Sequence, residues 1–161
     1  MRNASPRGFT LTEVMVVMVL AGVVTLGLVG FYLNSQATWM DASSQALAQR
    51  DATALVDAIA ARARGATSAK LGSPPNTVLT FYGPGFSDPY SFWWSQADSL
   101  VHQGPGDSSV DGGPVVPSLV ERFSVALDDS LPLVHLSMLQ LRSETGERVQ
   151  MQSTFTLYNA P

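Results

Sequence analysis

The distribution of charged residues divides the chain into an apolar beginning and a more polar remainder. After Glu13 the next charged residue is Asp41, and residues 14–33 carry no charged side chain. Twenty residues in a helix span roughly 30 Å, which is the thickness of the hydrocarbon core of a bilayer. The pattern therefore predicts a membrane-spanning helix near the amino terminus.

Residues 34–65 are expected to continue this helix with one apolar face. Alanine, glutamine and leucine, which favour helices, dominate the segment. Two arginines in the last turn before Gly65 are typical of a helix end. From Phe9 the helix would be roughly 85 Å long, too long for residues 66–161 to cover. Apolar positions three and four residues apart predict its buried face: Leu47, Ala48, Ala52, Leu55, Ile59 and Ala63.

Residues 66–161 have the pattern of short strands separated by turns. Segments 77–82, 91–95 and 99–103 lie between glycine- and proline-containing turns and are predicted strands. The glycine- and proline-rich segment 104–117 is expected to be irregular.

Three later segments alternate apolar and polar residues around Val125, Leu136 and Met151, which predicts half-buried antiparallel strands. A change of parity after Met138 predicts a β-bulge, and Gly146 suits a hairpin turn over residues 143–147. Such a sheet has one apolar face, for which the helical stripe is the natural cover, so the predicted fold class is α+β.

Composition and charge narrow the range of functions. The 161 residues are enough for one domain, and 9 Lys+Arg against 13 Asp+Glu give a net charge of −4, so nucleic acid is not an expected partner. The absence of cysteine excludes disulfides and thiolate chemistry. Arg2 and Arg7 precede the apolar segment and the next basic residue is Arg50, which predicts a cytoplasmic amino terminus and an exterior remainder.

Three interpretations fit this amino-terminal block. A secretory signal peptide would be cleaved after Ser35-Gln36-Ala37, but the apolar run is longer than usual and Glu13 lies at its start. An uncleaved anchor fits the length and gives no reason for a carboxylate at the membrane edge. The third interpretation rests on residues 8–13, which read glycine, an aromatic residue, a hydroxyl residue, leucine, any residue and glutamate.

This string resembles the class III leader of type IV pilins and type II secretion pseudopilins. The resemblance implies that a prepilin peptidase cuts between Gly8 and Phe9 and methylates the new amino terminus at Phe9. It divides the chain into a leader (1–8), a transmembrane and filament-core helix (9–33), an amphipathic half (34–65) and a β-rich head (66–161). The implied fold is the pilin fold, a long helix packed on a small antiparallel sheet.

Two roles are open for Glu13. The pattern Thr10-x-x-Glu13 is that of a capping box, in which the carboxylate returns to the first backbone N–H groups and meets the positive end of the helix dipole. The resemblance implies a second role, pairing with the α-amino group of Phe9 on a neighbouring subunit. Gly22, Gly27 and Gly30 suit either close helix packing or local melting, and major pilins often carry a helix-breaking proline at the position of Gly30.

Within the family the head is most similar to minor subunits of the W type in pili and the J type in type II secretion. The resemblance implies a non-enzymatic filament subunit, inserted in the inner membrane and built into a pilus or pseudopilus where it primes or caps assembly. Its implied partners are other pilins, the prepilin peptidase and an assembly platform with a cytoplasmic ATPase. The alternatives are a major pilin or a membrane-anchored, β-rich binding domain.

No catalytic, cofactor or metal motif is expected. His102 and His135 stand alone in predicted strands, and Asp128-Asp129 fits a solvated turn. Asp107 and Asp111 are candidate calcium ligands, although their spacing departs from the regular calcium loop. Trp93 and Trp94 fall on opposite faces of one strand, so we expect one of them to face a partner subunit.

Overall fold

The computed structural model of the chain describes residues 8–72, 78–106, 112–128 and 131–157. The chain forms two compact units, Met1–Asp41 and Ala42–Pro161, and the helix α1 (Leu11–Gly65) belongs to both. The fold class is α+β with a long apolar helix and antiparallel sheets, as the sequence predicts.

Helix α1 runs without interruption through its three apolar-half glycines and ends at Gly65 as expected. Arg62 and Arg64 lie in its last turn, where cations meet the negative end of the helix dipole. Its beginning differs from the prediction, because residues 8–10 precede the helix and Leu11 is its first residue. Thr10, a favoured N-cap residue, accounts for this later start.

The strands form two sheets, where the sequence pattern suggested one. The first sheet has the order β1-β2-β3-β4-β5, and the second has the order β6-β7-β8. All neighbouring strands are antiparallel. Their bounds are β1 (Ser68–Leu71), β2 (Val78–Tyr82), β3 (Tyr90–Ser95), β4 (Leu100–Pro105), β5 (Gly113–Pro114), β6 (Val120–Leu127), β7 (Leu133–Arg142) and β8 (Arg148–Thr156).

The β1 and β5 strands were not predicted. β1 has only four residues, Ser-Ala-Lys-Leu, too short a segment for its alternation to stand out, and it pairs antiparallel with β2. β5 has two residues and pairs with β4, which itself extends to Pro105, so the segment expected to be irregular contains strand structure at both ends. Residues 107–111, between these strands, lie outside the described part of the chain.

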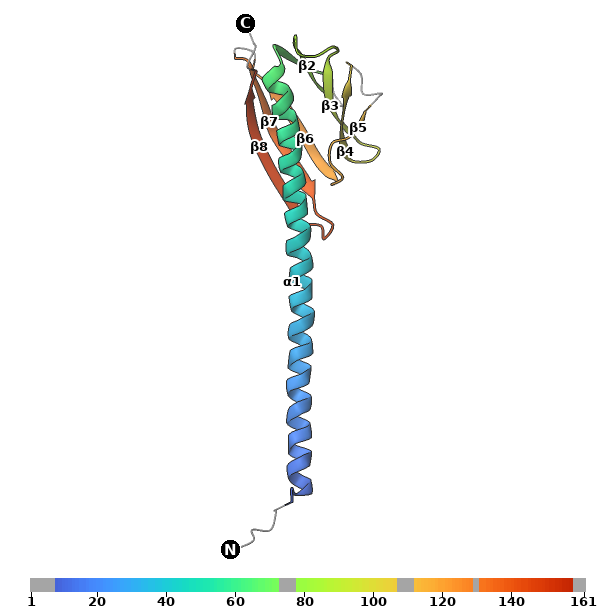
Figure 1. Ribbon diagram of the computed structural model, residues 1–161, viewed down its shortest axis with the longest axis vertical. Coiled ribbons are helices and arrows are strands. Elements are labelled where there is room, and N and C mark those ends of the chain that lie inside the picture. The colour runs from blue at the N-terminus through green and yellow to red at the C-terminus, as the bar shows by residue number, and fades with distance from the viewer. Residues whose placement is uncertain (1–7, 73–77, 107–111, 129–130, 158–161) are drawn as a thin grey trace, which may run out of the picture. The chain divides into compact units, whose positions relative to one another are not determined.

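The core of the second unit lies between α1 and the sheets. Figure 1 shows the carboxyl-terminal part of α1 running along β6, β7 and β8. Ala52, Leu55, Ile59 and Ala63 of the predicted stripe are buried, but Leu47 is 51% exposed, which corrects the prediction for that position. The sheets contribute the largest buried side chains, among them Phe81, Phe92, Leu79, Leu136, Leu139, Leu141, Val101, Val120 and Val134.

The predicted features of the β7–β8 hairpin are confirmed. Gly146 has a φ of 91°, and the Ser143 N–H donates to the Glu147 carbonyl over 2.8 Å to close the turn. The register between β7 and β8 shifts between Leu136 and Leu139, where the apolar parity changes. An extra residue at that point lets both Leu136 and Leu139 enter the core.

Two leucines of α1 give a matched test of this packing. We expect Leu55→Ala to lower the free energy of unfolding by about 2–5 kcal/mol, because the side chain is fully buried and a cavity would remain. Leu47→Ala, on the exposed side, should change it by less than about 0.5 kcal/mol. Denaturant unfolding of the full chain in detergent, followed by circular dichroism, measures both, and equal effects would contradict the placement of the helix face.

Candidate functional site

The predicted cleavage site lies in an exposed segment ahead of α1. Gly8, Phe9 and Thr10 have no helical structure, and Phe9 is 81% exposed. A Cβ added to Gly8 would meet no atom within 4 Å, so packing within the described residues does not require glycine there. The Gly8–Phe9 bond is therefore exposed and lies outside the helix, where a peptidase could reach it.

Thr10 caps the first turn of α1. The Glu13 N–H is 3.3 Å from Thr10 Oγ1 and 3.1 Å from the Thr10 carbonyl oxygen, and the Thr10 and Thr12 hydroxyls are 3.1 Å apart. This is the threonine half of the predicted capping box. The Glu13 side chain is exposed and accepts no hydrogen bond from the residues that the structure describes, so the returning half is not formed there.

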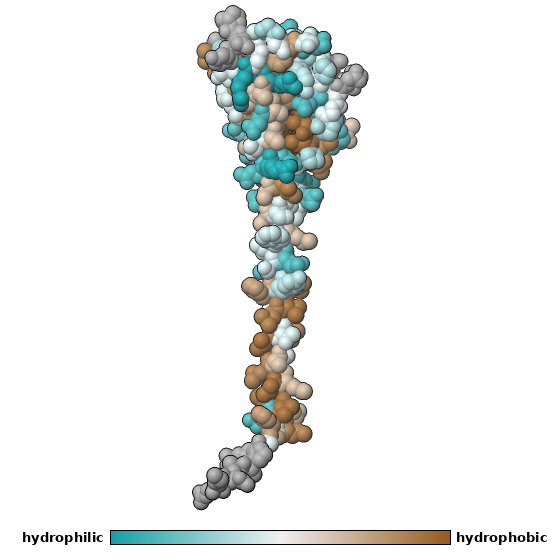
Figure 2. All heavy atoms as spheres, viewed as in Figure 1, coloured by the Kyte–Doolittle hydropathy of each residue, from teal (hydrophilic) through white to brown (hydrophobic). Residues whose placement is uncertain are grey.

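The apolar half of α1 is exposed along its whole length. Every residue from 14 to 33 is exposed, and Figure 2 shows hydrophobic side chains along this stretch. Its most apolar window of 18 residues has a mean hydropathy of 2.6, so the helix is long and apolar enough to cross a membrane. A Cβ at Gly22, Gly27 or Gly30 would meet nothing within 4 Å, so no contact within the described residues explains these glycines.

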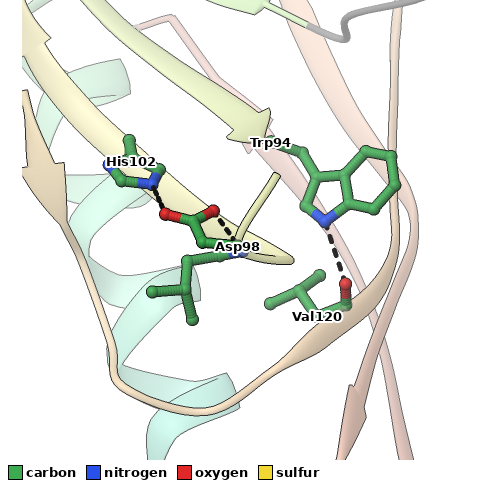
Figure 3. Close-up of polar contacts among 5 residues, drawn as sticks. Trp94, Asp98, His102 and Val120 are labelled. Carbon is green, nitrogen blue, oxygen red and sulfur yellow. Dashed lines mark hydrogen bonds and ion pairs between the residues drawn. The ribbon is translucent and has the colours of Figure 1, made fainter. Parts of the chain in front are cut away.

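The two tryptophans of β3 have partners inside the head. Trp93 is 6% exposed and stacks on the His102 ring at a centroid distance of 5.7 Å. A Cβ on Gly112 would collide with the Trp93 ring, so the Gly112 backbone covers it. Trp94 is half-buried, and its indole N–H donates to the Val120 carbonyl over 2.9 Å (Figure 3). Trp93 is buried and Trp94 is partly exposed, and contact of either with a partner subunit stays a prediction.

His102 is not solitary, because Asp98 lies beside it. The His102 Nε2–H donates to the Asp98 carboxylate over 2.7 Å, and the Leu100 N–H donates to the other carboxylate oxygen over 3.1 Å (Figure 3). Slight burial raises the pKa of Asp98, but hydrogen bonds from Ser95, Leu100 and His102 outweigh it and hold that pKa below its ordinary value. These hydrogen bonds stabilise the β3–β4 turn.

Several polar contacts between α1 and the β-rich part were not predicted. Asp51 is 9% exposed and accepts a hydrogen bond from Ser118 Oγ over 2.7 Å. The hydroxyls of Ser44 and Thr145 are 2.8 Å apart. The sequence did contain a signal for these contacts. Ser44 and Asp51 lie at helical spacing from the buried alanines and Leu55, and a polar residue on a buried face needs a hydrogen-bond partner.

The candidate metal-ligating side chains lie apart from one another among the described residues. No group of three or more His, Cys, Asp or Glu side chains converges there. His135 Nδ1 lies 2.9 Å from Thr154 Oγ1, and the Asp128 carboxylate accepts the Leu131 N–H over 3.0 Å in a turn. The candidate calcium ligands Asp107 and Asp111 lie outside the described residues.

The Asp98 pKa leads to a prediction of pH dependence. The pKa is lower in the folded chain than the unfolded value of about 3.9, so ionised Asp98 stabilises the fold above that pH, and the contribution is lost as the pH falls through the folded pKa. We expect Asp98→Asn to lower the unfolding midpoint at neutral pH by an amount that shrinks toward about pH 3. Asp57→Asn, at an exposed site on α1, is the control. A deficit that persists unchanged in acid would contradict the assignment.

Comparison with known proteins identifies the amino-terminal segment. The family model described as the prokaryotic N-terminal methylation motif matches residues 4–29. No curated protein and no solved structure matches the chain. The matched motif covers the cleavage site, Glu13 and most of the exposed apolar helix, and it indicates a type IV pilin-like or pseudopilin-like precursor that is anchored in a membrane.

Proposed function

We propose that the chain is a non-enzymatic minor subunit of a type IV pilus or a type II secretion pseudopilus. The observation that carries the proposal is the methylation motif at residues 4–29, which leads directly into an exposed apolar helix. The subunit would be made as a precursor in the inner membrane, with its amino terminus in the cytoplasm and its head on the other side. It would then be extracted and built into the filament, where it primes or caps assembly.

Processing is assigned to the exposed segment before α1. A prepilin peptidase would cut between Gly8 and Phe9 and methylate the amino group of Phe9. Cleavage there removes the residues that precede Phe9 and makes Glu13 the fifth residue of the mature chain. The non-helical backbone of residues 8–10 supports this assignment, because the scissile bond is not held in helical hydrogen bonds.

Glu13 is assigned the role of pairing with the Phe9 amino group of a neighbouring subunit. A charged carboxylate costs about 2.5–3.5 kcal/mol at a bilayer centre on insertion scales and less near the interface, so it gains from a positive partner. The attraction between the two charges is stronger in a low-dielectric environment. The role is supported by the exposed carboxylate, to which the described residues offer no hydrogen bond.

The partners proposed are other pilins, the prepilin peptidase and an assembly platform with a cytoplasmic ATPase. A place among minor subunits rests on the resemblance of the head to the W and J types and on Gly30, where major pilins often carry proline. The alternatives are a major pilin, which would be abundant along the filament, and an anchored binding domain, which would not enter a filament at all.

Substitution of Glu13 tests the assembly role. We expect Glu13→Gln and Glu13→Ala to be processed and to accumulate in the membrane normally. Their amount in sheared filaments should fall at least tenfold, since a lost interaction of about 1.4 kcal/mol already changes an equilibrium tenfold. Immunoblots of the filament and membrane fractions measure this, and Glu147→Gln in the exposed β7–β8 turn is the matched control. Normal incorporation of Glu13→Gln would show that the carboxylate has no role in assembly.

A further inference from the structure

Two large aromatic side chains lie at the carboxyl-terminal end of the apolar segment of α1 and just beyond it. Tyr32 is 60% exposed and Trp39 is 76% exposed, so the described residues bury neither ring. The residues between them include the polar run Asn34-Ser35-Gln36, and Asp41 is the first charge after the span. An exposed tryptophan within a polar stretch of helix has no structural role in its own unit.

The two aromatic residues lie on one side of the helix. They are seven positions apart, which returns a helix nearly to the same face. Gln36 lies between them on that face, and its Nε2 donates to the Tyr32 hydroxyl over 2.9 Å. This face of α1 therefore carries two aromatic rings, and each ring combines an apolar surface with one polar group, the phenol O–H or the indole N–H.

The spacing from Glu13 matches the dimensions of a bilayer. Tyr32 follows Glu13 by nineteen residues, roughly 28 Å of helix, close to the hydrocarbon thickness of about 30 Å. Trp39 follows Glu13 by twenty-six residues, roughly 39 Å, which is about 9 Å past the far hydrocarbon boundary and near the outer edge of the headgroup region on that side. With the carboxylate at one hydrocarbon boundary, Tyr32 falls at the opposite boundary and Trp39 falls in the outer part of the headgroup region.

We propose that Tyr32 and Trp39 form a lipid anchor at the membrane interface on the carboxyl-terminal side of the span. The Tyr32 ring would lie at the acyl boundary and the Trp39 ring in the headgroup region, where the phenol O–H and the indole N–H donate to lipid carbonyl and phosphate oxygens. The anchor fixes the depth and rotation of α1 before the subunit leaves the membrane. This inference rests on the membrane insertion in the proposed function.

Quenching of tryptophan emission by brominated lipids tests the anchor. The full chain is reconstituted in vesicles of phosphatidylcholine and phosphatidylglycerol that carry bromines either near the headgroup or near the chain ends. The difference in emission between the wild type and Trp39→Phe isolates Trp39, because Trp93 and Trp94 are common to both. We expect this emission to be lost mainly with the shallow bromines. A second variant, Leu20→Trp in the Trp39→Phe background, marks the middle of the span.

The two probes separate the anchor from the proposed membrane insertion. Deep quenching of the Leu20→Trp probe with shallow quenching of Trp39 supports the anchor. Deep quenching of the Leu20→Trp probe with an unquenched or deeply quenched Trp39 overturns the anchor and leaves the span intact. If neither probe is quenched, the membrane span itself is wrong and the anchor falls with it.

Discussion

The exposed apolar half of α1 is the constraint on which the rest of the account depends. Residues 14–33 are exposed in the chain by itself, and each large apolar side chain left in water forgoes about 1.5–3 kcal/mol of burial free energy. Nothing among the described residues covers them, so their partner is a membrane, another subunit, or each in turn. The methylation motif at residues 4–29 indicates a type IV pilin-like precursor that is anchored in a membrane, and the proposed function adds contact with other subunits. The proposed pairing of Glu13 at the start of this segment follows from the same constraint, because a carboxylate in apolar surroundings gains from a positive partner.

The carboxyl-terminal half of α1 differs, because its apolar face is buried against the sheets. Leu55, Ile59 and Ala63 pack against the sheets, Asp51 accepts a hydrogen bond from Ser118, and the hydroxyls of Ser44 and Thr145 are hydrogen-bonded to each other. The change from a helix that is apolar all round to one with a single apolar face falls near the first charge, Asp41. One helix can therefore serve an anchor or filament core and a folded head without a break in its backbone.

The helix and the later strands were predictable because their patterns are local. The end of α1 at Gly65, the Gly146 turn and the bulge near Met138 each follow from a few neighbouring residues. Leu47 was misplaced because it lies outside the arc of the helix that is buried, whose first residues are Ser44, Ala48 and Asp51, while the predicted stripe was drawn wide enough to include it. Separation into two sheets depends on which strands pair, and alternation within a strand does not contain that information.

In the candidate site, too, the features that depend on neighbouring residues were predictable and the contacts between distant segments were not. Gly8, Phe9 and Glu13 form a contiguous motif, and the family model matches there. Burial of Trp93 depends on His102 and on the backbone of Gly112, contacts between segments that the strand pattern does not specify. Asp98, the partner of His102, is only four residues earlier in the sequence. The two side chains meet because of the geometry of the turn between β3 and β4, which sequence spacing alone does not predict.

The amino-terminal peptide of the native protein, determined by mass spectrometry, tests the central claim most directly. The account predicts a chain that begins at N-methylated Phe9, because the motif places the cut after Gly8. A chain that begins at Thr38 would identify a secreted domain released by signal peptidase. An intact leader in cells with an active prepilin peptidase would identify a simple anchor, and either result would contradict the assignment of the chain to a filament.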